Sequence, residues 1–144
     1  MKRKILRTLT LALSCIMLFT ISATAFATST RASEYFSFTD AWTTPTGNGK
    51  FAIEFEVNAT RIMQEVGVSK IMIYERQSNG NFENVKTFTS DNTSGLIATN
   101  NSFAGGGVYY QGKSGTKYYT TVVFYAKNSN GSEKIYHDTP VFTA

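Results

Sequence analysis

One segment of this chain matches the spacing of a phosphate-binding loop. Residues 107–114, GVYYQGKS, place four residues between Gly107 and Gly112, and Lys113 and Ser114 follow directly. In such a loop, backbone amides and the positive end of a following helix hold the phosphate groups. The next residues, GTKYYTTVVFYA, are instead β-branched and aromatic with a period of two, which predicts a strand. We therefore interpret the segment as a strand followed by a turn, and we expect it to bind no nucleotide.

Residue types that catalyse hydrolysis are sparse in this sequence. His137 is the single histidine, and its neighbour Asp138 points to the opposite face of any strand that holds both. Glu54 and Glu56 lie two apart, about 7 Å along a strand, whereas a glycosidase needs two carboxylates across a cleft. No group of residues has the spacing of a metal site. We therefore expect no enzyme activity and no catalytic, cofactor-binding or metal-binding residues, and we interpret the two glutamates as part of a solvated outer face.

The N-terminus has the composition of a secretory signal peptide. A basic start, MKRKILR, precedes an apolar run from Leu9 to Ile21, and small residues, SATAFATST, follow the run. This order is typical of a cleaved export signal, and the apolar run is shorter than the roughly 20 residues of a membrane-spanning helix. We expect residues 1–27 to be removed by cleavage after Ala27, with Ala25 as the alternative site.

Cleavage changes the charge of the protein. Four of the fourteen basic residues and none of the ten acidic residues lie in residues 1–27, so residues 28–144 carry ten of each. The exported part is then nearly neutral and lacks the basic patch that binds nucleic acid or anionic membranes. The single cysteine, Cys15, lies in the apolar run. A domain of this length buries about two thirds of its unfolded surface and folds without disulfides.

The exported part consists of short alternating segments separated by turn residues. In residues 51–57, four apolar side chains alternate with polar ones, and Asn79-Gly80 suits a hairpin turn. We expect residues 60–67 to form one helical turn, and residues 90–107 to form a long connection with at most one short edge strand. The expected strands are 34–43, 51–57, 69–76, 82–89, 108–111, 117–127 and 134–143. Seven strands at this spacing predict a single all-β sandwich or barrel.

The last third of the chain carries a pattern of glycine, tyrosine and alternating core residues. Its members are Gly115, Thr116, Tyr118, Thr120, Val122, Phe124, Ala126, Asn128, Gly131, Thr139 and Thr143. The pattern resembles a fibronectin type III or related immunoglobulin-like module, although Gly112 and Ser114 stand where the family has leucine and proline. The resemblance implies an antiparallel sandwich in which the Tyr118 hydroxyl bonds back to the backbone, and it implies no activity. The whole chain also resembles small secreted proteins of unknown function from Gram-positive bacteria.

The alternation also predicts which side chains face outward. If Tyr118 and Phe124 face the core, Tyr119 and Tyr125 face solvent. In an immunoglobulin-like sandwich the third and sixth strands are neighbours, so two residues of the 69–76 strand join this face. Exposed aromatic and apolar patches mark interaction sites. The predicted interaction face consists of Met72, Tyr74, Tyr119, Val123 and Tyr125. Thr121 faces outward on the same strand, between Tyr119 and Val123.

These observations predict a secreted or cell-surface-associated, non-catalytic binding or adhesion module. We expect a monomer or weak dimer without a cofactor, whose partner is a protein or glycan at the cell surface. A structural envelope protein without a discrete ligand is the alternative, and a secreted toxin or bacteriocin-like protein is a third hypothesis. The sequence leaves open which partner is bound and whether the 90–107 connection covers the predicted interaction face.

Overall fold

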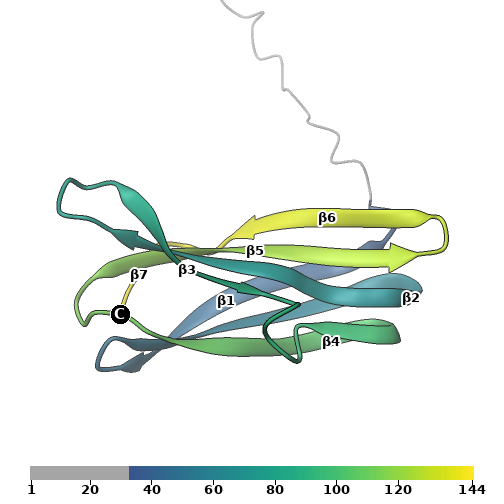
Figure 1. The fold of residues 1–144 in the computed structure, drawn as a ribbon, viewed down its shortest axis with the longest axis horizontal. Coiled ribbons are helices and arrows are strands. Elements are labelled where there is room, and N and C mark those ends of the chain that lie inside the picture. Colours follow the sequence, from purple (N-terminus) through teal and green to yellow (C-terminus); the bar gives the residue numbers. More distant parts are fainter. Residues whose placement is uncertain (1–32) are drawn as a thin grey trace, which may run out of the picture. The chain divides into compact units, whose positions relative to one another are not determined.

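The computed structural model of the chain describes residues 33–144, which form an all-β domain of seven antiparallel strands (Figure 1). The expected signal peptide and its cleavage sites lie outside the described residues. The strands are β1 (Phe36–Gly47), β2 (Lys50–Arg76), β3 (Phe82–Thr89), β4 (Ile97–Gln111), β5 (Lys117–Asn128), β6 (Gly131–Asp138) and β7 (Phe142–Thr143). The predicted all-β class and strand number are confirmed. Within residues 33–144, no helix is long and apolar enough to cross a membrane.

The 27-residue strand β2 organises the sheet. Its first half pairs with β1 along one edge and with β4 along the other. Its second half pairs with β5 along the same edge that β1 occupies in the first half. Along the other edge, β3 pairs with residues 70–76, after the last residue of β2 that pairs with β4. β6 and β7 extend the sheet from β5. In Figure 1, β6 runs along the top of the domain and β4 along the bottom.

The core lies inside the curl of this sheet. Side chains of the first half of β2, such as Phe51 and Phe55, form one buried cluster with Ile71 and Ile73 of the second half. Alternate residues of β5 complete the cluster: Tyr118, Val122, Phe124 and Ala126. Each strand therefore gives one set of side chains to the core and leaves the other set outside, as the alternation predicted.

The predicted helical turn at residues 60–67 is wrong, because β2 continues through it. The pairing of β2 with β4 shifts between Asn58 and Met63, and this irregularity lies between the two halves of β2. Met63 is fully buried there, whereas Ile62 is 71% exposed. The Thr60 amide bonds to the Tyr35 carbonyl, so the segment finds tertiary partners as a strand. Long-range pairing decided its conformation, and its local sequence did not show this.

The predicted long connection at residues 90–107 is also wrong in its second part, where β4 begins at Ile97. At Gly107, β4 approaches β2 so closely that glycine is required. A Cβ atom on Gly107 would lie 2.6 Å from the Ile53 carbonyl oxygen. Glycine in a strand often marks such a close approach of two backbones. Gly107, one of the residues that suggested a loop, is therefore one that allows the pairing.

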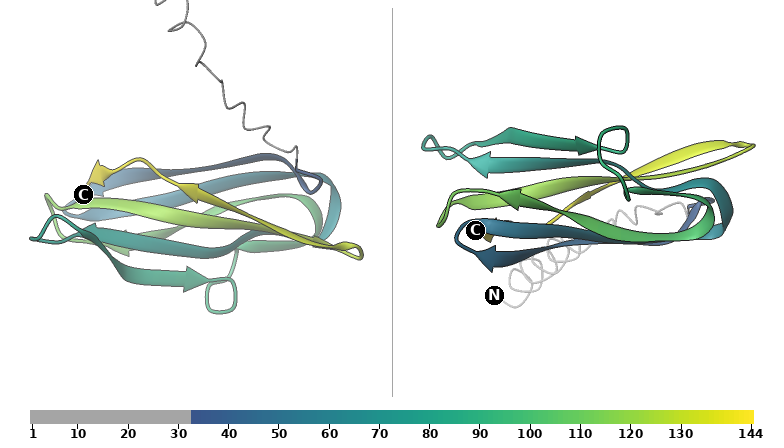
Figure 2. Two further views of the ribbon diagram at one scale, coloured as in Figure 1. Left: turned by 90° about the horizontal axis from the view of Figure 1, so that it is seen from above. Right: turned by 60° about the horizontal axis from the view of Figure 1, so that its bottom comes forward.

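The end of the chain closes one side of the domain. Phe142 of β7 packs edge-on against Phe51, with ring centroids 4.7 Å apart. The Gly115 amide bonds to the Ala144 carbonyl, and the Ala144 amide bonds to the Thr116 carbonyl. Both views in Figure 2 place the C-terminus beside the turn that joins β1 and β2. The predicted strand, turn and strand around residues 107–117 are confirmed by β4, the turn at Gly115 and β5.

Candidate functional site

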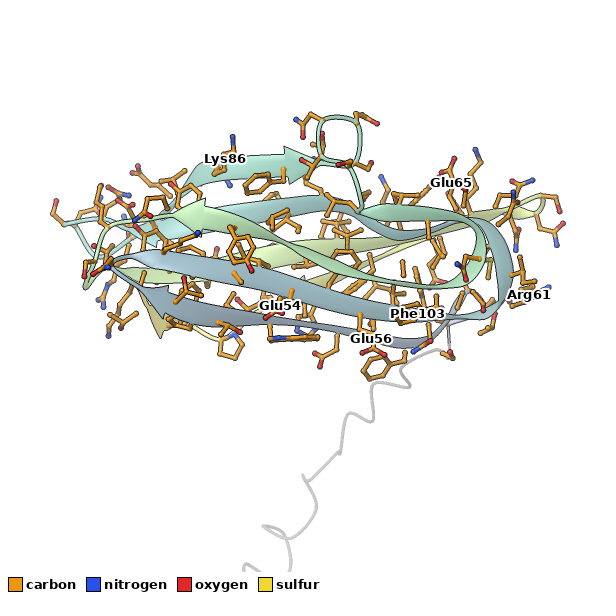
Figure 3. The ribbon with its side chains drawn as sticks, turned by 90° about the horizontal axis from the view of Figure 1, so that it is seen from below. Glu54, Glu56, Arg61, Glu65, Lys86 and Phe103 are labelled. Atoms are coloured by element: carbon orange, nitrogen blue, oxygen red, sulfur yellow. The ribbon has the colours of Figure 1, made fainter. Side chains whose placement is uncertain are left out.

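The outward side of β1, β2 and β4 carries four rows of residues in register. In one row, Trp42 lies opposite Glu54, and Glu54 lies opposite Gly107. The neighbouring rows are Thr44–Ala52–Tyr109, Asp40–Glu56–Gly105 and Phe38–Asn58–Phe103. Directly paired residues project to the same side of a sheet, so the four rows form one surface, which we call the aromatic face. Figure 3 shows Glu54, Glu56 and Phe103 along this part of the domain.

A hollow of about 280 Å³ lies in the aromatic face, and Trp42, Glu54, Gly107 and Tyr109 are among its lining residues. Gly106 and Gly107 are also among its lining residues, and Gly107, which ends the row of Trp42, projects no side chain above the sheet. Gly105, Gly106 and Gly107 form what we call the glycine strip. A Cβ atom on Gly105 would lie 3.1 Å from the ring of Phe103, so this ring leans over the strip. The hollow is therefore bounded by aromatic rings and floored by backbone.

The aromatic side chains of this face are unusually exposed. Phe38, Trp42 and Phe103 are between 41% and 47% exposed, and Tyr109 is 66% exposed. Among the described residues, none of the four rings packs against another aromatic ring. A Lys50 ammonium lies 4.9 Å from the centroid of the Tyr109 ring. Large apolar rings without ring partners, gathered on one surface, are typical of an interaction site.

Glu54 fixes the orientation of Trp42. The indole Nε1–H of Trp42 and the hydroxyl of Thr44 both donate to Glu54 Oε2, each over 3.0 Å. Because these bonds hold the tryptophan from its polar edge, they leave the ring face free for a ligand. They occupy one carboxylate oxygen, and the other has no hydrogen-bond partner among the described residues. The site thus combines an oriented ring with a hydrogen-bond acceptor.

Charge on the aromatic face is mostly negative. Glu56 has neither an ion-pair nor a hydrogen-bond partner within residues 33–144, and Asp40 lies 4.0 Å from His137 Nε2. With Glu54, these acids occupy two adjacent rows. The prediction that Glu54 and Glu56 share one outer face is confirmed. The surface around them differs from an ordinary solvated face, because the two glutamates lie between exposed aromatic rings.

The predicted interaction face lies on the other half of the sheet. Met72 and Tyr74 of β2 are in register with Thr121 and Tyr119 of β5, so the structure brings these residues together as predicted. The rings of Tyr74 and Tyr119 stack with centroids 4.6 Å apart and planes 4° apart. Phe82 of β3 packs edge-on against Tyr119 at 5.0 Å. We call the five predicted residues the tyrosine face, and much of its aromatic surface is used by its own rings.

Two details of the tyrosine face differ from the prediction. Val123 is on the outer side but only 3% exposed, because it lies in register between the longer side chains of Lys70 and Tyr136. Tyr136 of β6 was not predicted and is 68% exposed. β4 does not cover this face, since it pairs with the earlier part of β2. The strand that packs a ring on this face is β3, whose Phe82 contacts Tyr119.

Tyr118 is fully buried at the start of β5 and joins three segments. Its hydroxyl accepts a hydrogen bond from the Lys113 amide over 2.9 Å, as the sequence pattern predicted. The same hydroxyl donates to Glu75 Oε2 over 2.7 Å, a partner that the sequence did not reveal. Lys113 Nζ completes the cluster by pairing with Glu75 Oε1 at 2.6 Å.

This cluster changes the acidity of its members. Hydrogen bonds from Lys113 and Tyr118 hold the pKa of Glu75 below its usual value, and burial opposes them. Burial raises the pKa of Tyr118 to about 12. The hydrogen bond and charge of Glu75 raise the pKa of Lys113. Lys113, the lysine of the phosphate-loop spacing, is thus engaged by a carboxylate within the fold.

The other residues singled out from the sequence are not brought into a shared site. His137 of β6 pairs with Val122 of β5, and the His137 ring lies edge-on to Phe124 with centroids 6.3 Å apart. Asp138 accepts a hydrogen bond from the Thr121 hydroxyl. In the part of the chain that the structure describes, no three histidine, cysteine or acidic residues are grouped to hold a metal ion.

Sequence reasoning missed the aromatic face because Phe103, Gly105 and Gly107 lay in a segment interpreted as a connection. Trp42 was placed on the first strand and Tyr109 on the expected strand 108–111, but residues 97–107 were not recognised as part of the same strand as Tyr109. A usable signal was present: Phe103 and Tyr109 flank the run AGGGV at residues 104–108. A glycine run between exposed aromatic residues indicates a close backbone approach next to a binding surface.

Comparisons with known proteins give no family for this chain. No protein-family model matches it, and none of the curated proteins is similar to it. Among solved structures, a family 76 glycoside hydrolase from a bovine Bacteroides thetaiotaomicron strain is similar over 76% of this chain and 21% of that chain. The TM-score is 0.34 and the identity is 14%. This chain spans about a fifth of the hydrolase, and a likeness at this level does not bear on its function.

Proposed function

We propose that this protein is an exported, non-catalytic binding module that contacts its ligand through the aromatic face. In this proposal the chain carries a cleaved signal peptide, and residues 28–144 form an immunoglobulin-like sandwich that works in the medium or at the cell surface as a monomer or weak dimer. The order of basic, apolar and small residues at the N-terminus supports export. The hydrogen bond of the Tyr118 hydroxyl to the Lys113 amide supports the immunoglobulin-like arrangement.

The observation that carries the proposal is the pair of exposed rings beside the glycine strip. Trp42 and Tyr109 both line the hollow, and they are 41% and 66% exposed. The exposed part of these rings contributes nothing to folding, since burial is what makes aromatic side chains stabilising. A hollow with apolar walls and a few placed polar groups is the usual form of a ligand site.

Binding without catalysis fits the placement of the carboxylates. Glu54 and Glu56 project from one strand to one side of the sheet, so neither faces the other across a bound substrate. Glu54 Oε2 already accepts two hydrogen bonds that orient Trp42. These carboxylates are therefore suited to accept hydrogen bonds from a ligand.

A cell-retention assay tests the proposal. The purified protein is incubated with washed cells of the producing organism, and the retained fraction is measured after washing. We expect the double variant Trp42→Ala, Tyr109→Ala to lose retention, because it removes both walls of the hollow. The triple variant Tyr74→Ser, Tyr119→Ser, Tyr125→Ser tests the tyrosine face in parallel. Thermal melts of both variants confirm that they are folded.

Three outcomes contradict the proposal. If the folded triple variant loses retention and the double variant keeps it, the ligand site is the tyrosine face. If neither variant loses retention, the protein is held by another surface, as expected for a structural envelope component. If the wild-type protein is not retained at all and kills related cells, the toxin hypothesis replaces the binding module.

A further inference from the structure

We infer that the aromatic face binds an extended glycan that carries no anionic groups. This inference rests on the proposed function and names the ligand class for the same surface. It follows from three properties of the face: the kind of groups that it presents, the length over which it presents them, and the sign of its charge.

The groups presented suit a pyranose ring better than other small polar units. A pyranose has an apolar face of C–H groups, which packs on an aromatic ring, and an edge of hydroxyl groups, which donate hydrogen bonds. Trp42 offers its ring face because Glu54 holds its indole N–H. The free oxygen of Glu54 and both oxygens of Glu56 then serve as acceptors for hydroxyl groups. An apolar surface with a few fixed polar groups provides orientation and specificity.

The aromatic face is longer than a single sugar unit. Phe103 and Tyr109 lie six residues apart on β4, which corresponds to about 20 Å at the rise of a strand. On β1, Phe38 and Trp42 lie four residues apart, or about 14 Å. The register places one ring of each strand towards each end: Phe38 and Phe103 share a row, and Trp42 and Tyr109 lie in adjacent rows. The two glycines and two glutamates lie between these ends, so a linear chain can contact both.

The charge of the face excludes polyanions. Asp40, Glu54 and Glu56 supply three carboxylates in two adjacent rows. The Lys50 ammonium lies beside the Tyr109 ring, at the end of the face away from Asp40 and Glu56. Like charges placed against a partner suppress its binding. Uronate polymers and phosphate-linked polymers are therefore disfavoured, whereas neutral and amine-bearing glycans are accepted.

The single tryptophan of the chain makes a direct test available, because Trp42 lies in the site. Trp42 emission is titrated with cellohexaose, N-acetylchitohexaose and hexagalacturonate, and with the disaccharide of each. We expect at least one neutral hexasaccharide to shift the emission and to bind at least about tenfold more tightly than its disaccharide. We expect hexagalacturonate not to bind.

Matched variants show whether the rings carry this binding. Tyr109→Ala is compared with Tyr136→Ala, since the two tyrosines are 66% and 68% exposed but lie on different faces. We expect Tyr109→Ala to weaken hexasaccharide binding at least about tenfold and Tyr136→Ala to leave it unchanged. Phe38→Ala with Phe103→Ala should weaken the hexasaccharide more than the disaccharide, because these rings lie at the far end of the face.

The glycan inference is overturned if no neutral hexasaccharide binds, if hexagalacturonate binds as tightly as the neutral chains, or if Tyr109→Ala and Tyr136→Ala behave alike. These failures differ from a failure of the proposed function. If the Trp42, Tyr109 double variant loses retention on cells and every hexasaccharide fails to bind, the binding face stands and its ligand is not a glycan. An extended peptide that adds to the free edge of β4 is then the partner class to test.

Discussion

The outer surface of the sheet carries aromatic residues beside both halves of β2, but the rings make different contacts on the two sides. Beside the second half, Tyr74 and Tyr119 stack on each other and Phe82 packs against them. Beside the first half, Trp42 and Tyr109 have no ring partner within residues 33–144 and border a hollow. Aromatic content alone therefore does not identify a binding face, because rings that satisfy one another stabilise the fold.

The glutamates of β2 show the same contrast. Glu75, in the second half, is 5% exposed and bonds to Tyr118 and Lys113. Glu54 and Glu56, in the first half, face outward and keep free acceptor atoms. One strand thus places a paired carboxylate inside the fold and available carboxylates on its surface. The second half is where we expect mutations to affect stability, and the first half is where we expect them to affect binding.

The largest effect on stability is expected for Tyr118→Phe. This change removes the acceptor of the Lys113 amide and the donor to Glu75, and leaving buried polar groups unpaired costs roughly 1–3 kcal/mol in the free energy of unfolding. Urea denaturation measures the loss. Tyr119→Phe is the control, since it keeps the stacked ring and should cost far less. Equal and negligible losses in both variants would show that the buried cluster does not hold β5 in place.

The same cluster predicts how stability depends on pH. The pKa of Tyr118 is raised to about 12 in the folded protein, so the folded state keeps a proton that the unfolded state releases near pH 10. Its contribution is complete below the unfolded pKa and is lost as the pH rises through about 12. The lowered pKa of Glu75 acts in the opposite range: its contribution is present above the usual glutamate pKa and is lost as the pH falls through the lowered value.

Thermal melts from acid to alkaline pH check both signs. Wild type should lose stability more steeply above pH 10 than Tyr118→Phe, which has no phenol at this position. In the acid range, Glu75→Gln should show a weaker pH dependence than wild type, because its side chain cannot titrate. Curves that stay parallel across both ranges would remove the cluster as a source of pH-dependent stability.

A smaller effect on the free energy of unfolding is expected when two outward-facing tyrosines, Tyr119 and Tyr109, are each replaced by alanine. Tyr119→Ala breaks the stack with Tyr74, and aromatic pairs contribute about 0.5–1.5 kcal/mol beyond their buried area. Tyr109→Ala removes a ring that is 66% exposed, and we expect a change within about 0.5 kcal/mol. Urea denaturation of the two variants compares them directly. A larger loss for Tyr109→Ala would mean that the aromatic face is part of the folding core.

The sequence predicted those parts of the fold in which the alternation of apolar and polar side chains indicates which of them are buried. Strict alternation in residues 51–57 and 117–127 identified the inward residues correctly. A bond from the Tyr118 hydroxyl back to the backbone was also expected, and the structure names its partner as the Lys113 amide. Residues 60–67 and 97–107 were misassigned because their conformation depends on distant strands. Gly107 illustrates the limit: it has no side chain to show a pattern, and its role is set by the Ile53 carbonyl beside it.

The same limit applies to the candidate site. The tyrosine face could be assembled from two recognised strands, and its residues do lie together. Whether its rings are free depends on Phe82, whose contact with Tyr119 crosses from one strand to another. The aromatic face needs β1, β2 and β4 in register, and the register of β4 is not encoded in its glycines. The aromatic face could be located only from the pairing of β1, β2 and β4 in the structure.

The most direct test of the central claim is quenching of Trp42 fluorescence by acrylamide. Trp42 is the only tryptophan in the chain, so its emission reports on the aromatic face alone. Soluble fragments released from the surface of the producing cells are added to the protein, and binding is confirmed by co-sedimentation or retention. The account predicts that bound fragments protect Trp42 from acrylamide in the wild-type protein and that Tyr109→Ala shows neither binding nor protection. Fragments that bind while Trp42 remains as accessible to acrylamide as in the free protein would contradict it.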